Sequence, residues 1–288
     1  KKDGPNAPLT IVALSNYGVA CQWLGDYDRA LKVHRDAEDR ARTSHPGDVP
    51  LTLRCEGRCA ANLASLARNS EAIVKYEGAI QKARAVLGTG NHATLRLQIG
   101  LAKAHRQLGN VDRAIRLTTD ALKLSSSRNS TSQLTWRITL ADLYRENSEL
   151  ELASKELGMV QPILDARYKP TDSIRIYFAY AYGRLQLDSA RWEKATQSFR
   201  TCIEQEQRLP PNDLFARYSE LFLAIAQARL GNQSASQEVL SQLNKRLRDC
   251  FSEYSLNRRV EFDRYFNEYQ NELIGLAPEL DWDFRVDR

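Results

Sequence analysis

The feature that most constrains the fold of this chain is a short sequence that recurs at a fixed interval. The stretch GDYDRAL, residues 25–31, returns as GNVDRAI, residues 109–115, and each copy follows a leucine. Between the two copies, Ala72 stands 42 residues after Ala30 and 42 residues before Ala114. A fixed interval of this size indicates an array of similar structural repeats, because each repeat needs the same packing residues at the same places.

The alanine that anchors each repeat can be followed through six repeats, with later intervals of 39, 42 and 41 residues. The anchors are Ala30, Ala72, Ala114, Ala153, Ala195 and Ser236. We expect repeats near residues 11–44, 53–86, 95–125, 134–165, 173–208 and 214–247, within an array that spans residues 1–248. Residues 249–288 are rich in Phe and Tyr, break the pattern, and are expected to form a capping helix and a tail.

Each repeat has the pattern of two amphipathic helices joined by a tight turn. In the first repeat, apolar residues recur at spacings of three and four on both sides of Gly25-Asp26, which is typical of helices that bury one face. Small residues recur where the two helices must approach closely, at Gly18, Ala60, Ala102, Ala141, Gly183 and Ala224. The sequence therefore predicts an all-α fold of about six helix pairs, each of which buries its apolar faces against its neighbours.

These joints resemble the tetratricopeptide repeat (TPR). The resemblance rests on Tyr17-Gly18, Gly25-Asp26-Tyr27, Ala30 and Ala37, and on the linkers GPNAPLT and GTGNHATL. The interval of 42 residues, longer than the usual 34, is similar to the kinesin-light-chain-like type of the repeat. The resemblance implies an α-α superhelix, a TPR solenoid, that binds a protein or peptide segment on its concave face.

In the family that this chain resembles, the first helix of each pair lines the concave face. Transferring those positions implies a binding surface that contains Gln22, Trp23, Arg58, Lys103, Arg106, Asp142, Arg145, Tyr177, Tyr180 and Arg184. The second repeat also places Arg54 inward. Arginines and aromatic rings suit an acidic or phosphorylated segment. The alternative is that these arginines are ordinary solvated side chains on helix surfaces.

Charge and apolar content narrow the class of partner. The 41 basic and 36 acidic residues are mixed along the chain, so the sequence does not favour nucleic-acid binding. The longest apolar run, residues 176–183, is too short to span a membrane.

Five scattered cysteines and an opening that does not resemble a signal peptide lead us to expect a reducing compartment, the cytoplasm, for a chain that is a piece of a larger protein.

The sequence contains none of the common catalytic or metal-binding motifs. It has no GxxxxGK[ST] loop, no HExxH and no CxxC. Cys55 and Cys59 lie one helical turn apart, and His34 and His105 fall at packing positions, so we expect all four in the core. The prediction is a protein without catalytic residues, metal or cofactor.

Three functional hypotheses remain open from the sequence. The first is a non-catalytic interaction scaffold, part of a larger signalling protein, that holds a protein or peptide segment in its groove. The second is a regulatory sensor that responds to short oligopeptides. The third is an enzyme built on an α-solenoid, which would need a buried acid–base pair or a metal site, and the sequence shows neither.

Overall fold

The computed structural model describes residues 4–126, 129–205 and 215–250, together with 266, 269, 273 and 275–277. The part of the chain that it describes is built from helices and contains no strand. The twelve helices are α1 (Pro8–Trp23), α2 (Tyr27–Ser44), α3 (Val49–Ser65), α4 (Asn69–Leu87), α5 (His92–Gln107), α6 (Val111–Leu124), α7 (Thr131–Glu146), α8 (Leu150–Arg167), α9 (Ser173–Asp188), α10 (Trp192–Glu204), α11 (Phe215–Arg229) and α12 (Gln233–Cys250).

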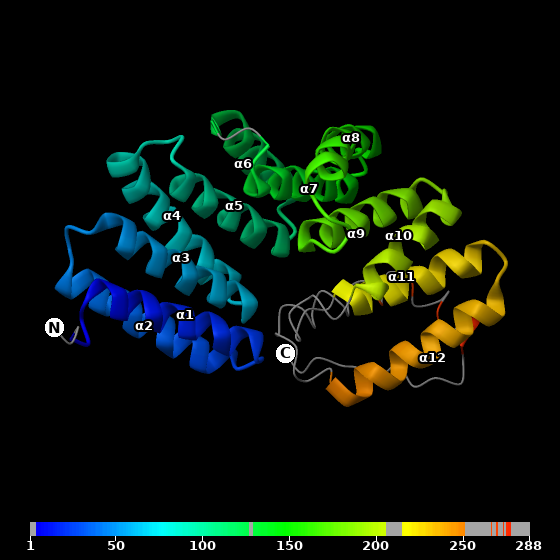
Figure 1. The fold of residues 1–288 in the computed structure, drawn as a ribbon, viewed down its shortest axis with the longest axis horizontal. Helices are drawn as coiled ribbons and strands as arrows, with labels where there is room; N and C mark the ends of the chain where they lie inside the picture. Colours follow the sequence, from blue (N-terminus) through cyan, green and yellow to red (C-terminus); the bar gives the residue numbers. More distant parts are fainter. Residues whose placement is uncertain are drawn as a thin grey trace. The chain divides into compact units, whose positions relative to one another are not determined.

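The contacts divide the chain into two compact units, unit 1 (Lys1–Trp136) and unit 2 (Arg137–Arg288). In unit 1, each helix from α1 to α6 packs against the next one along the chain (Figure 1). In unit 2, α9 packs on α10, α10 on α11 and α11 on α12. The serial packing that the repeat pattern predicts is therefore present within each unit.

The six anchor residues lie at the centres of the helix pairs. Each of them is completely buried, and the small residues expected opposite them are buried as well. At Gly18 and Gly183 the lack of a side chain makes room for a ring, because an added Cβ would lie 2.6 Å from the ring of His34 and 2.8 Å from the ring of Phe199. His34 and Phe199, on the second helices of their pairs, thus fill space that glycines on the first helices leave open.

All six helix pairs turn in the same way. One residue of each turn has a positive φ, and these residues are Gly25, Ala67, Gly109, Ser148, Ala190 and Gly231. The amide that follows each of them donates to a carbonyl five residues earlier, as from Asp26 to Cys21 at 3.0 Å and from Arg191 to Gln186 at 2.8 Å. This is the Schellman motif, which satisfies the last carbonyls of the first helix and reverses the chain.

Two linkers of unit 1 supply a side-chain cap for the first helix that follows. Asp48 accepts from the amide of Leu51 at 3.1 Å, and Asn91 accepts from the amide of Ala93 at 2.9 Å. Thr10, Thr52 and Thr94, which recur at the interval of 42 residues, donate to backbone carbonyls earlier in the chain, as Thr94 does to the carbonyl of Gly88 at 2.9 Å. Both linkers are therefore fixed to the start of the helix that follows them.

The expected capping segment, residues 249–288, lies mostly outside the described residues. Where it is described, Phe266, Leu273 and Ala277 are buried in the same core cluster as α11 and α12. The edge of the Tyr269 ring faces Phe222 with 6.1 Å between ring centroids, and Gln237 donates to the carbonyl of Leu276 at 2.8 Å. At these positions the chain packs on α11 and α12, and a capping helix over residues 249–288 stays a prediction.

Candidate functional site

Three arginines on consecutive first helices of unit 1 form the most distinctive charged group in the described structure. Arg54 and Arg58 lie one turn apart on α3, and Arg96 lies on α5, which packs against α3. Arg96 stands 42 residues after Arg54, so the two occupy the same position in successive repeats. Arg54 and Arg96 are exposed, and Arg58 is half-buried. We call Arg54, Arg58 and Arg96 the arginine site.

The arginine site has no acidic partner within the described part of the chain. The only hydrogen bond that Arg58 makes there runs from its Nη1 to the Oγ of Ser15 on α1, at 2.8 Å. Burial lowers the pKa of Arg58, and the positive charges of Arg54 and Arg96 lower it further. Three like charges held close together without a carboxylate attract an anion, because an anion relieves their mutual repulsion.

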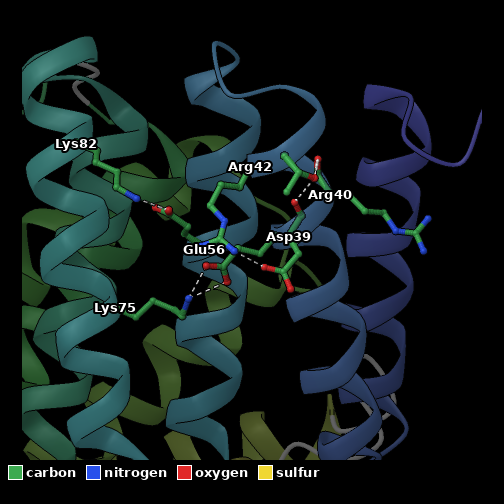
Figure 2. A network of polar contacts seen from close by, with 8 residues as sticks. Asp39, Arg40, Arg42, Glu56, Lys75 and Lys82 are labelled. Carbon is green, nitrogen blue, oxygen red and sulfur yellow. Dashed lines mark hydrogen bonds and ion pairs between the residues drawn. The ribbon is translucent and has the colours of Figure 1, made fainter.

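Several cations elsewhere in unit 1 have acidic partners. Lys75 on α4 lies 2.5 Å from a carboxylate oxygen of Glu38 on α2, and Lys82 on α4 lies 2.6 Å from Glu56 on α3 (Figure 2). Arg42 on α2 pairs with Asp39 one turn earlier at 2.9 Å. Unit 1 therefore contains carboxylates that pair several of its cations, whereas the three clustered cations of the arginine site have none in the described structure.

The other sequence-predicted residues of unit 1 occupy varied settings. Gln22 is half-buried and donates from its Nε2 to the Oδ1 of Asn62 at 2.6 Å, so it ties α1 to α3. Lys103 is exposed and Arg106 is half-buried on α5, and each already has an interaction of its own. Trp23 is the last residue of α1, and its side chain lies outside the described part. Of this group, Arg58 belongs to the arginine site.

In unit 2, Arg145 is enclosed by carboxylates. It is only 7% exposed, and its guanidinium nitrogens lie 2.8 Å from Asp188, 3.0 Å from Asp142 and 3.5 Å from Glu146. Burial and the nearby Arg184 lower the pKa of Arg145, but the three carboxylates outweigh them and leave it raised. Asp142 is thus a structural partner of Arg145, and the charge of Arg145 is already neutralised within unit 2.

The remaining predicted residues of unit 2 lie in or near its core. Arg184 is 3% exposed, its guanidinium carbon lies 4.6 Å from the centroid of the Phe222 ring, and its Nη1 donates to the Oη of Tyr180 at 3.4 Å. Tyr180 is buried in the core cluster, and Tyr177 is half-buried. Such packing of a guanidinium on an aromatic face stabilises the fold, and it leaves little of Arg184 for a partner to contact.

Sequence reasoning did not single out Arg96, although the signal was present. Arg54 was placed inward by the resemblance, and moving one repeat along the sequence from Arg54 leads directly to Arg96. The burial of these side chains could not be predicted from the repeat in the same way. Arg58, Arg145 and Arg184 were all assigned to one face, and only the structure shows that the last two are buried.

His34 and the four described cysteines are buried. Burial, with a smaller contribution from Arg58, lowers the pKa of His34 to about 4. Burial raises the pKa of Cys59 to about 11 and that of Cys202 to about 12, so both thiols stay protonated. In the part of the chain that the structure describes, no group of three or more His, Cys, Asp or Glu side chains could hold a metal ion. None of the described helices has the length and apolar content needed to cross a membrane.

Comparison with solved structures identifies known proteins with a similar fold. No protein-family model matches the chain. No curated protein matches it either. Solved structures do match: one contains the nearly identical TPR-like repeats of a Podosopora anserina protein assigned as a kinesin light chain, which is 20% identical, with a TM-score of 0.53 over 67% of this chain and 93% of that one.

Two further structures extend the likeness over more of the chain. BtubC (BKLC) from P. vanneervenii is 15% identical, with a TM-score of 0.60 over 81% of this chain and 92% of that one. The Cut9–Hcn1 hetero-tetramer of APC/C is 14% identical, with a TM-score of 0.61 over 94% of this chain and 46% of that one. The chain is therefore a helical repeat solenoid with the TPR fold. Its structural neighbours include kinesin-light-chain-like repeats, as the interval of 42 residues predicts.

Proposed function

We propose that this protein is a non-catalytic interaction module whose arginine site binds an acidic segment of another protein. The observation that carries the proposal is the group of three arginines on α3 and α5 without a carboxylate partner in the described structure. Arginine presents a planar fork of donors that matches carboxylate or phosphate oxygens, so acidic and phosphorylated segments both fit. The TPR fold supports a protein partner, since the neighbouring Cut9–Hcn1 structure is itself an assembly of proteins.

The proposal concentrates binding on unit 1. The predicted cations Lys103 and Arg106 lie on α5, the helix that also holds Arg96, and they extend the positive surface. Arg145 and Arg184 serve mainly to hold unit 2 together, because both are buried. Trp23, on α1, and Tyr177, in unit 2, stay sequence predictions for aromatic contacts with a partner.

We place this activity in the cytoplasm, within a signalling protein. Four of the five cysteines are described; all four are free and buried, which fits a reducing compartment. No catalytic role is proposed, since the buried thiols are kept protonated and the buried His34 is kept neutral at physiological pH.

Fluorescence anisotropy tests the proposal with a labelled oligoglutamate peptide, a labelled phosphoserine peptide and a labelled oligolysine peptide as probes. We expect the two acidic peptides to bind and the oligolysine peptide not to bind, with affinity falling as salt rises. The double variant Arg54→Glu with Arg96→Glu should weaken binding at least about tenfold, because reversing two charges turns attraction into repulsion.

A matched variant separates a specific site from net charge. Lys32 on α2 and Arg116 on α6 are exposed cations on second helices. Lys32→Glu with Arg116→Glu changes the net charge by the same amount and should leave binding within about twofold of the original. Equal losses in the two double variants would show that the acidic peptides respond only to overall charge, and the proposed site would then be wrong.

A further inference from the structure

Helices α4, α5 and α6 of unit 1 line a surface pocket that shares no residue with the arginine site. The pocket has a volume of about 300 Å³, which is the size of the smaller ligand pockets in proteins. Its floor is apolar and consists of Ile80 on α4, Leu101 on α5 and Leu117 on α6, all of them buried. Such a floor favours a ligand with an apolar part, because that part displaces water from apolar surface.

The preceding repeat closes the equivalent place with an ion pair. Glu38 and Lys75 stand 42 residues before Ile80 and Leu117, so they occupy the same repeat positions on α2 and α4. The Nζ of Lys75 lies 2.5 Å from a carboxylate oxygen of Glu38 and joins the two helices (Figure 2). In the next repeat two apolar side chains replace this pair. The pocket therefore results from a specific change of residues and is not a general property of the repeat.

Two opposite charges lie at one end of the pocket. Glu77 on α4 and Arg113 on α6 both line it and are exposed, and neither side chain makes a hydrogen bond or an ion pair with the described residues. Burial and the charge of Arg113 lower the pKa of His105 on α5, and the charge of Glu77 acts in the opposite direction, so both charges lie near the same ring. Opposite charges that are close but not paired suit a ligand that carries an anion and a cation side by side.

A third charge is fixed at the other end of the pocket. Arg84 lines the pocket from α4, two helical turns after Glu77, and donates from its Nη2 to the Oε1 of Gln98 on α5 at 3.1 Å. Gln98 is only 1% exposed, and it donates from its Nε2 to the carbonyl of Leu117 at 2.8 Å. These two bonds hold the guanidinium of Arg84 beside the apolar floor. A guanidinium in this setting attracts the face of an aromatic ring.

We propose that this pocket binds a free aromatic amino acid. The carboxylate of the ligand accepts from Arg113, its ammonium group donates to Glu77, and its ring lies on the apolar floor against Arg84. The opposite charges select this occupant over an internal segment of a peptide, because an internal residue carries neither of the two head-group charges. The proposal does not rest on the function proposed for the arginine site.

Isothermal titration calorimetry tests the proposal with L-tryptophan as the ligand. The matched ligands are tryptamine, which lacks the carboxylate, and indolepropionate, which lacks the amine. We expect L-tryptophan to bind at least about tenfold more tightly than either, because each of them leaves one charge of the pocket without a partner. L-leucine should also bind more weakly, since it has no ring for Arg84.

Two substitutions of exposed residues assign the head-group contacts. Arg113→Gln should weaken L-tryptophan binding at least about tenfold and should not weaken tryptamine binding. Glu77→Gln should weaken L-tryptophan binding by a similar factor and should not weaken indolepropionate binding. An equal effect of Arg113→Gln on L-tryptophan and on tryptamine would overturn the proposed pairing of charges.

The preceding repeat supplies a variant that closes the pocket. Ile80→Glu with Leu117→Lys introduces the ion pair that Glu38 and Lys75 form, and should abolish L-tryptophan binding while circular dichroism shows unchanged helicity. As a control, Arg116→Gln neutralises an exposed cation of α6 outside the pocket and should leave binding within about twofold of the original.

Each outcome bears on the proposal. A protein that does not bind L-tryptophan at millimolar concentrations, or that binds it equally well in the helical ion-pair variant, overturns it. If the ion-pair variant loses helicity, the ligand preferences of the two exposed-residue variants decide the matter. Binding of L-leucine as tight as that of L-tryptophan overturns the aromatic preference.

Discussion

Arg58 in unit 1 and Arg145 in unit 2 occupy first helices of the same repeat pattern, and their surroundings are opposite. Arg58 is half-buried and donates to Ser15, and burial together with the charges of Arg54 and Arg96 lowers its pKa. Arg145 is buried among Asp142, Glu146 and Asp188. The comparison teaches that a place on a first helix does not fix the surroundings of an arginine: one arginine has no carboxylate partner in the described structure, and the other is enclosed by three.

The largest expected effect is on stability, when Arg145 is replaced. Arg145→Met leaves three carboxylates close together and without their cation, and should lower the free energy of unfolding by about 3 kcal/mol. Arg58→Met removes a charge that its neighbours repel, and should change stability by less than about 1 kcal/mol. Urea unfolding followed by circular dichroism measures both, and similar losses in the two variants would contradict the contrast.

A second effect concerns the buried ring beside the arginine site. His34 is fully buried, its two ring nitrogens have no hydrogen-bond partner in the described structure, and its pKa is lowered from 6.5 to about 4. Between these values the unfolded chain binds a proton that the folded chain does not. Stability should therefore fall as pH decreases from about 6.5 to 4, by about 3 kcal/mol, and this contribution should not change above pH 6.5 or so.

The matched variant for this prediction is His34→Phe. Phe199 stands at the same repeat position in unit 2 and packs its ring against Gly183, as His34 packs against Gly18. A phenylalanine should fit this space and remove most of the pH dependence between pH 6.5 and 4. Thermal unfolding across that range measures the slope, and an unchanged slope would assign the pH dependence to other groups.

A smaller effect on stability is expected at the turns, which have the same geometry in the two units. Ala67 in unit 1 and Ala190 in unit 2 have φ values of 57° and 54°, where glycine is favoured. Ala67→Gly and Ala190→Gly should each stabilise the protein by about 1 kcal/mol, and Gly109→Ala should destabilise it by a similar amount. Thermal unfolding of the three variants measures these shifts, and a destabilised Ala67→Gly would show that strain at that turn is relieved elsewhere.

The smallest expected effect is on the stability of unit 1, when two residues of the arginine site lose their charge. Arg54→Gln with Arg96→Gln removes repulsion from Arg58 and should stabilise unit 1 by up to about 0.5 kcal/mol at low salt, with the gain lost at high salt. Urea unfolding at two ionic strengths measures it. A destabilised double variant at low salt would mean that the two arginines contribute favourable contacts.

The helical fold could be predicted from the sequence because its joints depend on small residues at fixed intervals. Ala30 and its five equivalents are fully buried, so their spacing reports the packing directly. The arginine site was only partly predictable. The repeat places Arg54 and Arg96 in one register, but the burial of Arg145 depends on Asp188, which lies 43 residues later on another helix. Which carboxylate meets which cation is set by packing, and the repeat pattern does not contain that information.

The shared turn has a consequence for how the molecule folds. Each pair of helices is closed by hydrogen bonds between residues only a few positions apart, so a pair can begin to form without contacts from distant parts of the chain. Order can start at any one of the six bends and spread outward to adjoining pairs. A destabilising substitution in one helix pair would then stop folding from extending through that pair, and the helix pairs on either side would still be able to fold.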